Sequence, residues 1–115
     1  MENYSNVLVE APKESFVSEL IPAKVIYRIE ATDSVVTKVK YTNEFGKTIH
    51  LDDVTLPFEL SFQKSFEPGS AIGLRAYNYG GEDLQLTILI DGKIVNRRKY
   101  FGQGFVPGDL IHFFL

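Results

Sequence analysis

The dipeptide Asp91-Gly92 and its surroundings constrain the fold more than any other part of the chain. Two apolar runs, 84–90 and 93–101, flank it. Asp-Gly between apolar runs is typical of a two-residue β-hairpin, because a type I′ turn needs a positive φ at both central residues. The sequence therefore predicts an antiparallel hairpin here, within an all-β protein.

Alternating apolar and polar residues predict further strands, each with one buried face. The clearest case is Val25, Tyr27 and Ile29, which alternate with charged residues. The predicted strands cover residues 23–30, 35–41, 47–51, 58–63, 72–77, 84–90 and 93–101. About seven short strands at this spacing are typical of an antiparallel immunoglobulin-like β-sandwich.

Turn residues separate these strands. Asn43–Gly46 is predicted to close a hairpin, with Gly46 supplying a positive φ. Glu67–Ser70 is predicted to form a second turn, and Asp52–Thr55 a loop. Pro57 should mark a strand start or an edge strand, because proline cannot donate a hydrogen bond to a ladder.

The two ends of the chain are harder to interpret. Residues 1–22 are expected to form a partly ordered N-terminal arm, and residues 23–115 a single β-sandwich domain. Within the arm, residues 7–9 are predicted to form a short strand. Residues 12–21 are predicted to form a helical turn or an extended segment that ends at Pro22. The apolar segment 104–115 forms either a final strand or a contact surface.

Composition narrows the function classes. A net charge of −3 argues against nucleic-acid binding, which usually requires a strongly basic face. The chain contains no cysteine, so a disulfide or a thiolate site is excluded. No signal peptide or membrane span is visible. We expect the periplasm or cell envelope if a leader has been removed, and the cytoplasm otherwise.

No pattern of catalytic or metal-binding residues stands out. His50 and His112 are far apart in sequence, and Asp52 and Asp53 near His50 are better explained as turn residues than as ligands of a hard cation. The chain has no Gly-x-Ser-x-Gly elbow and no phosphate-binding loop. We therefore expect no catalytic site, no metal and no cofactor.

Arginine and tyrosine side chains give the best candidates for a binding surface, because both are enriched at interaction hot spots. The only basic run, 97–99, is predicted to lie on an edge strand whose charges prevent aggregation, with contact to an anionic partner as the alternative. The predicted recognition surface is a sheet face or edge that carries Arg75, Tyr77, Tyr79, Arg97 and Lys99.

Three motifs resemble the MmpS-like family in their order along the chain: Tyr41–Gly46, Leu56–Phe58 and Leu86–Val95. The resemblance implies an immunoglobulin-like sandwich that acts outside the cytoplasm, as an accessory subunit of RND-type lipid and siderophore exporters. It implies no catalytic residues. The membrane helix and the two cysteines of the family have no counterpart here. One cysteine position falls at about Leu86, where an apolar contact to the C-terminal segment would replace the bridge.

The sequence thus predicts a non-catalytic binding or accessory module, of the bacterial cell envelope, that assists a membrane transporter. Its partner would be a protein or a lipid-like ligand, with no nucleic acid. Membrane association would occur only through a partner or a missing anchor. The alternative is a self-associating structural subunit that uses strand addition or arm exchange, including a homodimer through Ile111–Leu115.

Overall fold

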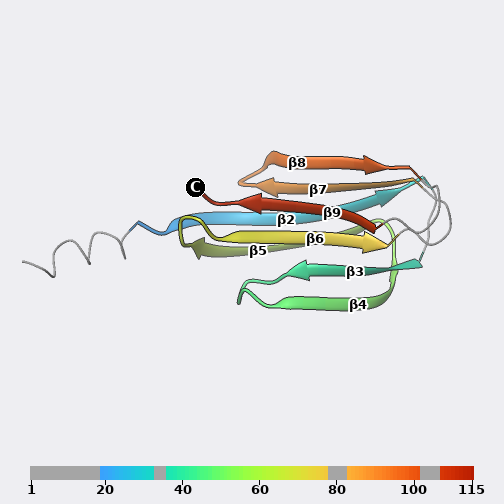
Figure 1. Cartoon of the computed structure of the whole chain (residues 1–115), viewed down its shortest axis with the longest axis horizontal. Coiled ribbons are helices and arrows are strands. Elements are labelled where there is room, and N and C mark those ends of the chain that lie inside the picture. Colours follow the sequence, from blue (N-terminus) through green and yellow to red (C-terminus); the bar gives the residue numbers. More distant parts are fainter. Residues whose placement is uncertain (1–18, 33–35, 78–82, 102–106) are drawn as a thin grey trace, which may run out of the picture.

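Eight strands in the described part of the chain form two antiparallel sheets, packed face to face in a computed structural model (Figure 1). The structure describes residues 19–32, 36–77, 83–101 and 107–115. The first sheet has the order β5-β2-β7-β8, and the second has the order β4-β3-β6-β9. The strands are β2 (Ile21–Ala31), β3 (Val36–Thr42), β4 (Thr48–Thr55), β5 (Phe58–Phe66), β6 (Ala71–Tyr77), β7 (Leu84–Ile90), β8 (Lys93–Tyr100) and β9 (Pro107–Phe113). The predicted all-β antiparallel sandwich is confirmed.

Both predicted hairpins are present. Asp91 and Gly92 have φ values of 52° and 82°, as the type I′ turn between β7 and β8 requires. Gly46 has a φ of 76° in the turn between β3 and β4. There the Asn43 side chain accepts hydrogen bonds from the backbone N–H groups of Phe45 and Lys47, both at 2.9 Å. The turn chemistry of these short segments is therefore sufficient to explain both hairpins.

The core consists of the alternating apolar positions of the strands. In β2 the buried residues are Val25, Tyr27 and Ile29, which confirms the predicted face. Tyr27 also links the sheets, because its hydroxyl donates a 2.6 Å hydrogen bond to the carbonyl of Thr42 on β3. Other buried apolar residues include Val39, Leu56, Phe66, Ile72, Leu74, Ala76, Leu84, Leu86, Ile88, Leu110 and Phe114.

Most connections cross from one sheet to the other. Only β3–β4 and β7–β8 are neighbours both in sequence and in a sheet among the described strands. The consecutive strands β2 and β3 lie in opposite sheets, and so do β4 and β5. The described strands therefore form a sandwich whose two sheets are linked repeatedly by the chain.

The segment Asp52–Thr55 corrects the sequence prediction, because it is part of β4 and not a loop. The β3–β4 register shifts between Thr37 and Val39, and Asp53 has a φ of 56°. A β-bulge of this kind admits one extra residue, and aspartate tolerates a positive φ better than most residues. The two aspartates thus form a bulge within a strand, which their turn-like composition conceals.

The C-terminal segment forms a strand, one of the two predicted alternatives. Leu110 on β9 and Phe114 after it are buried, while Ile111 and Phe113 are exposed. At the other end, β2 begins at Ile21 and includes Pro22, which pairs in register with Ser65. The predictions for residues 7–9 and 12–18 lie outside the described residues.

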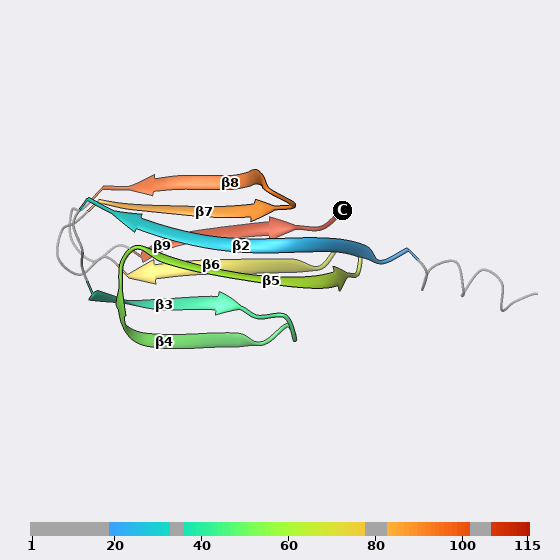
Figure 2. The ribbon, with the colours of Figure 1, turned by 180° about the vertical axis from the view of Figure 1, so that it is seen from behind.

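The two sheets are offset sideways. Opposite views show that β3 and β4 lie beyond the β5 edge of the first sheet (Figures 1 and 2). The burial agrees with this offset. Ile72, Leu74 and Ala76 on β6 are buried, whereas the inward residues Ile49 and Leu51 on β4 are only half-buried. One long side of the sandwich is therefore less completely covered than the rest of the core.

Candidate functional site

The structure divides the predicted recognition residues between two sheets. Arg75 and Tyr77 lie on β6 of the second sheet, and Arg97 and Lys99 lie on β8 of the first. Tyr79 lies outside the described residues. Each pair faces outward, because the neighbouring positions on β6 are buried and Arg97 and Lys99 pair with outward positions of β7. The four described residues therefore do not lie on one sheet face.

The outer face of the second sheet holds a row of polar side chains, one from each strand. His50, Lys40, Arg75 and Asp109 are in register across β4, β3, β6 and β9. The Arg75 guanidinium donates to the Asp109 carboxylate at 3.3 Å, and this hydrogen bond raises the pKa of Arg75. Lys40 forms no ion pair within the part of the chain that the structure describes.

A shallow depression of about 240 Å³ lies over this face. Its floor is at Gly73, whose missing side chain leaves room between Ile111 on β9 and Thr42 on β3. Lys40, Arg75 and Asp109 contribute to its walls. The depression can accept a small group that combines an apolar part with hydrogen-bond acceptors.

An exposed apolar side chain, Ile111, lines the depression, and a second, Phe113, follows two residues later on β9. Ile111 is 50% exposed and Phe113 is 58% exposed, and they lie opposite Gly73 and Ala71 of β6. Sequence reasoning singled out this segment as apolar but could not tell which residues face outward. We call Lys40, Gly73, Arg75, Ile111 and Phe113 the β9-side face.

The outer face of the first sheet carries the other predicted pair. Arg97 donates a hydrogen bond to the hydroxyl of Thr87 at 3.2 Å, and Lys99 lies over the Phe101 ring at 5.8 Å. Strand β8 lies at the sheet edge, as predicted for the basic run. These contacts hold both cations along the surface of the sandwich.

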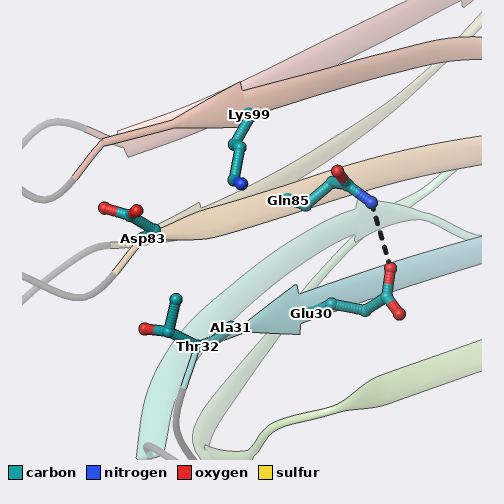
Figure 3. Close-up of a pocket in the computed structure, with 6 residues that line it drawn as sticks. All are labelled: Glu30, Ala31, Thr32, Asp83, Gln85 and Lys99. Carbon is teal, nitrogen blue, oxygen red and sulfur yellow. Dashed lines mark hydrogen bonds between the residues drawn. The ribbon is translucent and has the colours of Figure 1, made fainter.

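Lys99 also borders a depression of about 210 Å³ at the end of the first sheet (Figure 3). Its amine points toward β7, between Asp83 and Gln85, and Gln85 donates to the Glu30 carboxylate at 3.2 Å. The depression is lined by Glu30, Ala31, Thr32, Asp83, Gln85 and Lys99. These groups can form hydrogen bonds with a small polar ligand, but the hollow is shallow.

The two histidines lie apart in the fold as well as in the sequence. His50 is exposed on β4, and His112 is half-buried on β9, where it packs edge-on against Phe114. Burial lowers the pKa of His112. Within residues 19–32, 36–77, 83–101 and 107–115, no three histidine or acidic side chains gather as a metal site would require.

Strands β8 and β9 are joined by side chains. The Asn96 amide donates to the carbonyl of Ile111 at 2.9 Å. The Tyr100 hydroxyl donates to the carbonyl of Asp109 at 2.7 Å and accepts from its N–H at 3.0 Å. Two side chains thus bind backbone groups of β9 that an adjacent strand would otherwise bind.

Searches against protein-family models and curated proteins find no match for this chain. The fold and the β9-side face therefore define a β-sandwich protein, and the resemblance to the MmpS-like family has no support from a family match. The described part of the chain contains no helix that is long and apolar enough to cross a membrane.

Proposed function

We propose that this protein is a non-catalytic interaction module that binds a partner protein through the β9-side face. The observation that carries the proposal is that exposed apolar side chains lie on the same face as Lys40, a cation without an ion pair among the described residues. Ile111 and Phe113 would lose apolar surface to water on binding, which favours association. Lys40, which lines the same depression as Ile111, would meet an acidic side chain of the partner.

A partner of this chemistry fits better than an anionic polymer. The chain has a net charge of −3, and the Arg75 charge on this face is already matched by Asp109. One cation next to an apolar patch selects a protein surface with a single acidic group among apolar residues. Specificity would come from Lys40 and affinity from the apolar pair.

The finer proposal is an accessory protein of the bacterial cell envelope that assists a membrane transporter. It is supported only by the three motifs that resemble the MmpS-like family. Crosslinking in source cells, followed by fractionation and capture, tests it. Recovery of a transporter or another envelope component supports this location, and recovery from cytosol alone contradicts it.

The interaction face itself is tested with variants in the same capture experiment. Ile111→Ser with Phe113→Ser should remove the partner, and Lys40→Glu should reduce its recovery. Phe45→Ser is the matched control, because Phe45 is 75% exposed at the tip of the β3–β4 hairpin. Equal loss in the control variant would show that exposed apolar residues bind nonspecifically, and unchanged recovery with the face variants would exclude this face.

Self-association through Ile111–Leu115 is a second candidate, favoured by the 97% exposure of Leu115 beside Phe113. Sedimentation equilibrium of the full chain distinguishes the two candidates. A mass that rises with concentration, and falls back in the Ile111→Ser and Phe113→Ser double variant, favours a homodimer. A monomer at every concentration favours a different protein as partner.

A further inference from the structure

Among the described strands, three of the four edge strands are protected against pairing with another chain. Sheet edges expose unpaired backbone groups, and proteins protect them with bulges, charges or covering groups. Strand β8 has a register shift against β7 and carries the basic run 97–99. Strand β4 has the bulge at Asp53, and β9 is covered by Asn96 and Tyr100. Strand β5 is the fourth.

Strand β5 has no bulge and no covering side chain in the part of the chain that the structure describes, and its one charge without an ion pair there is Lys64 near its end. All nine of its residues pair with β2, from Phe58 opposite Ile29 to Phe66 opposite Ile21, without a register shift. It contains no proline, and the charge of Glu59 is matched by Arg28 at 2.9 Å. A long, regular edge of this kind is the usual template for strand addition.

The backbone groups on the open edge of β5 can be assigned. Lys24 of β2 accepts a hydrogen bond from the Asp91 N–H, so its backbone groups point toward the β7 side. Backbone direction alternates along a strand, so Val25 and its alternate neighbours point toward β5. The residues of β5 that lie opposite them have even numbers, and their backbone groups are therefore bonded to β2. The open edge of β5 therefore presents N–H and C=O groups of Glu59, Ser61, Gln63 and Ser65.

An apolar ledge lies next to this edge. Strands β3 and β4 extend beyond β5, so among the described strands the first sheet has none above β4 (Figure 2). The inward side chains there are half-buried: Tyr41, Ile49, Leu51 and Val54. A strand added to β5 would lie above this ledge and cover these side chains, as β2 and β7 cover the rest of the core.

We propose that β5 and this ledge bind one extended segment of a partner protein, which adds to the first sheet as a fifth strand. Its backbone would bond to the open edge at Ser61 and Gln63. Its side chains at alternate positions would be apolar, because they would rest on Leu51 and Ile49. This site is separate from the β9-side face and does not depend on it.

A positive charge at the end of the ledge indicates which charge the bound partner segment should carry. Lys64 faces inward near the end of β5, with its amine 5.5 Å from the centre of the Phe66 ring. It forms no ion pair among the described residues. The bound segment would therefore place a carboxylate beside Lys64, either from an acidic side chain or from its own C-terminus.

A second copy of β5 does not fit this edge. Twofold pairing of β5 with itself would bring β3 and β4 of both copies into the same space, because both strands extend beyond the edge (Figures 1 and 2). A single extended segment has no second sheet behind it, so it meets no such obstacle. The occupant is for this reason a segment and not a whole sandwich.

Amide hydrogen exchange of the full chain gives the first test. The N–H groups of Ser61 and Gln63 should exchange fast in the isolated protein. Adding a nine-residue peptide of alternating valine and threonine, with a glutamate at each end, should slow both by at least about tenfold. Slow exchange in the isolated monomer, relieved by deleting residues 1–18, would overturn the proposal by showing that the chain's own segment occupies the edge.

Variants test the two halves of the site. Gln63→Pro removes an open-edge N–H without removing a bond to β2, and Leu51→Asp places a charge on the ledge. Each should weaken peptide binding by at least about tenfold in calorimetry. Ile94→Asp on β8 is the matched control, because Ile94 is an exposed apolar residue far from β5, and it should leave the affinity unchanged. Circular dichroism checks that each variant is folded, and unchanged affinity in folded Gln63→Pro and Leu51→Asp would refute the proposal.

Discussion

The Tyr100 hydroxyl lies between the carbonyl oxygen and the amide nitrogen of Asp109, at 2.7 and 3.0 Å. A single side-chain group thus forms both hydrogen bonds that a neighbouring strand would form at this residue. Tyr100 belongs to the first sheet and Asp109 to the second. The contact therefore protects the edge of β9 and also closes this side of the sandwich.

Replacing Tyr100 with phenylalanine should lower the free energy of unfolding by about 1–3 kcal/mol, because two backbone groups lose their partner. Urea denaturation measures this change. Tyr41→Phe is the control, since the Tyr41 hydroxyl forms no hydrogen bond within the described residues. Equal destabilisation of the two variants would show that the Tyr100 hydroxyl contributes nothing specific.

Gly108→Ala should destabilise the protein by about 1–3 kcal/mol, because an added methyl group has no room. Its Cβ would lie 2.8 Å from the Tyr100 ring and 3.0 Å from Leu86. Gly73→Ala on the adjacent strand is the matched control, since its Cβ would meet its neighbours at ordinary distances of 3.6 Å or more. Thermal unfolding compares the two, and a smaller effect at Gly108 than at Gly73 would contradict this packing.

Alkaline pH should destabilise the fold through Tyr27. Burial, with a smaller contribution from Tyr41, raises the pKa of the Tyr27 hydroxyl above its usual value near 10. The unfolded chain loses this proton more easily than the folded chain, so stability is retained below about pH 10 and falls above it.

Tyr27→Phe tests this dependence and removes the bond to Thr42. It should cost about 1–2 kcal/mol at neutral pH. Above pH 10 the deficit should shrink by up to about 1.4 kcal/mol per pH unit, because the variant has no proton to lose at this position. Denaturant unfolding across pH 8–11 measures both, and a deficit that stays constant would exclude the titration of Tyr27 as its cause.

Mild acid should also destabilise the fold, through His112. Burial lowers the pKa of His112, so the unfolded chain binds a proton more readily than the folded chain. Its contribution to stability is present above about pH 6.5 and is lost as the pH falls through the folded value.

His112→Gln should therefore flatten the decline in stability between pH 7 and pH 5. Thermal denaturation at several pH values measures the slope. His50→Gln is the matched control, because it removes an exposed histidine from β4. A slope that His112→Gln leaves unchanged would assign the decline to other groups.

The strands could be predicted because alternation and turn residues are local signals. The assignment of Val25, Tyr27 and Ile29 to one face depends only on the residues next to them in the chain. The assignment of Asp91-Gly92 to a turn depends only on these two residues. The contact implied at Leu86 is also present, since this side chain packs beside Gly108 of the C-terminal strand. Whether it replaces a disulfide stays a prediction.

The placement of the recognition residues could not be predicted, because alternation does not say which sheet a strand joins. Arg75 and Arg97 look equivalent in sequence, yet they lie in different sheets. The bulge at Asp53 was missed for a related reason. A positive φ within a strand is set by the register of the partner strand, and the composition of Asp52-Asp53 indicates only a turn.

The crossing of the chain between the sheets bears on how the protein is made. Strand β2 pairs with β5 and β7, and β6 pairs with the C-terminal strand β9. Neither sheet is complete until almost the entire chain is available. A nascent chain whose residues 107–113 are still inside the ribosome lacks β9, so the native sandwich cannot form before these residues emerge.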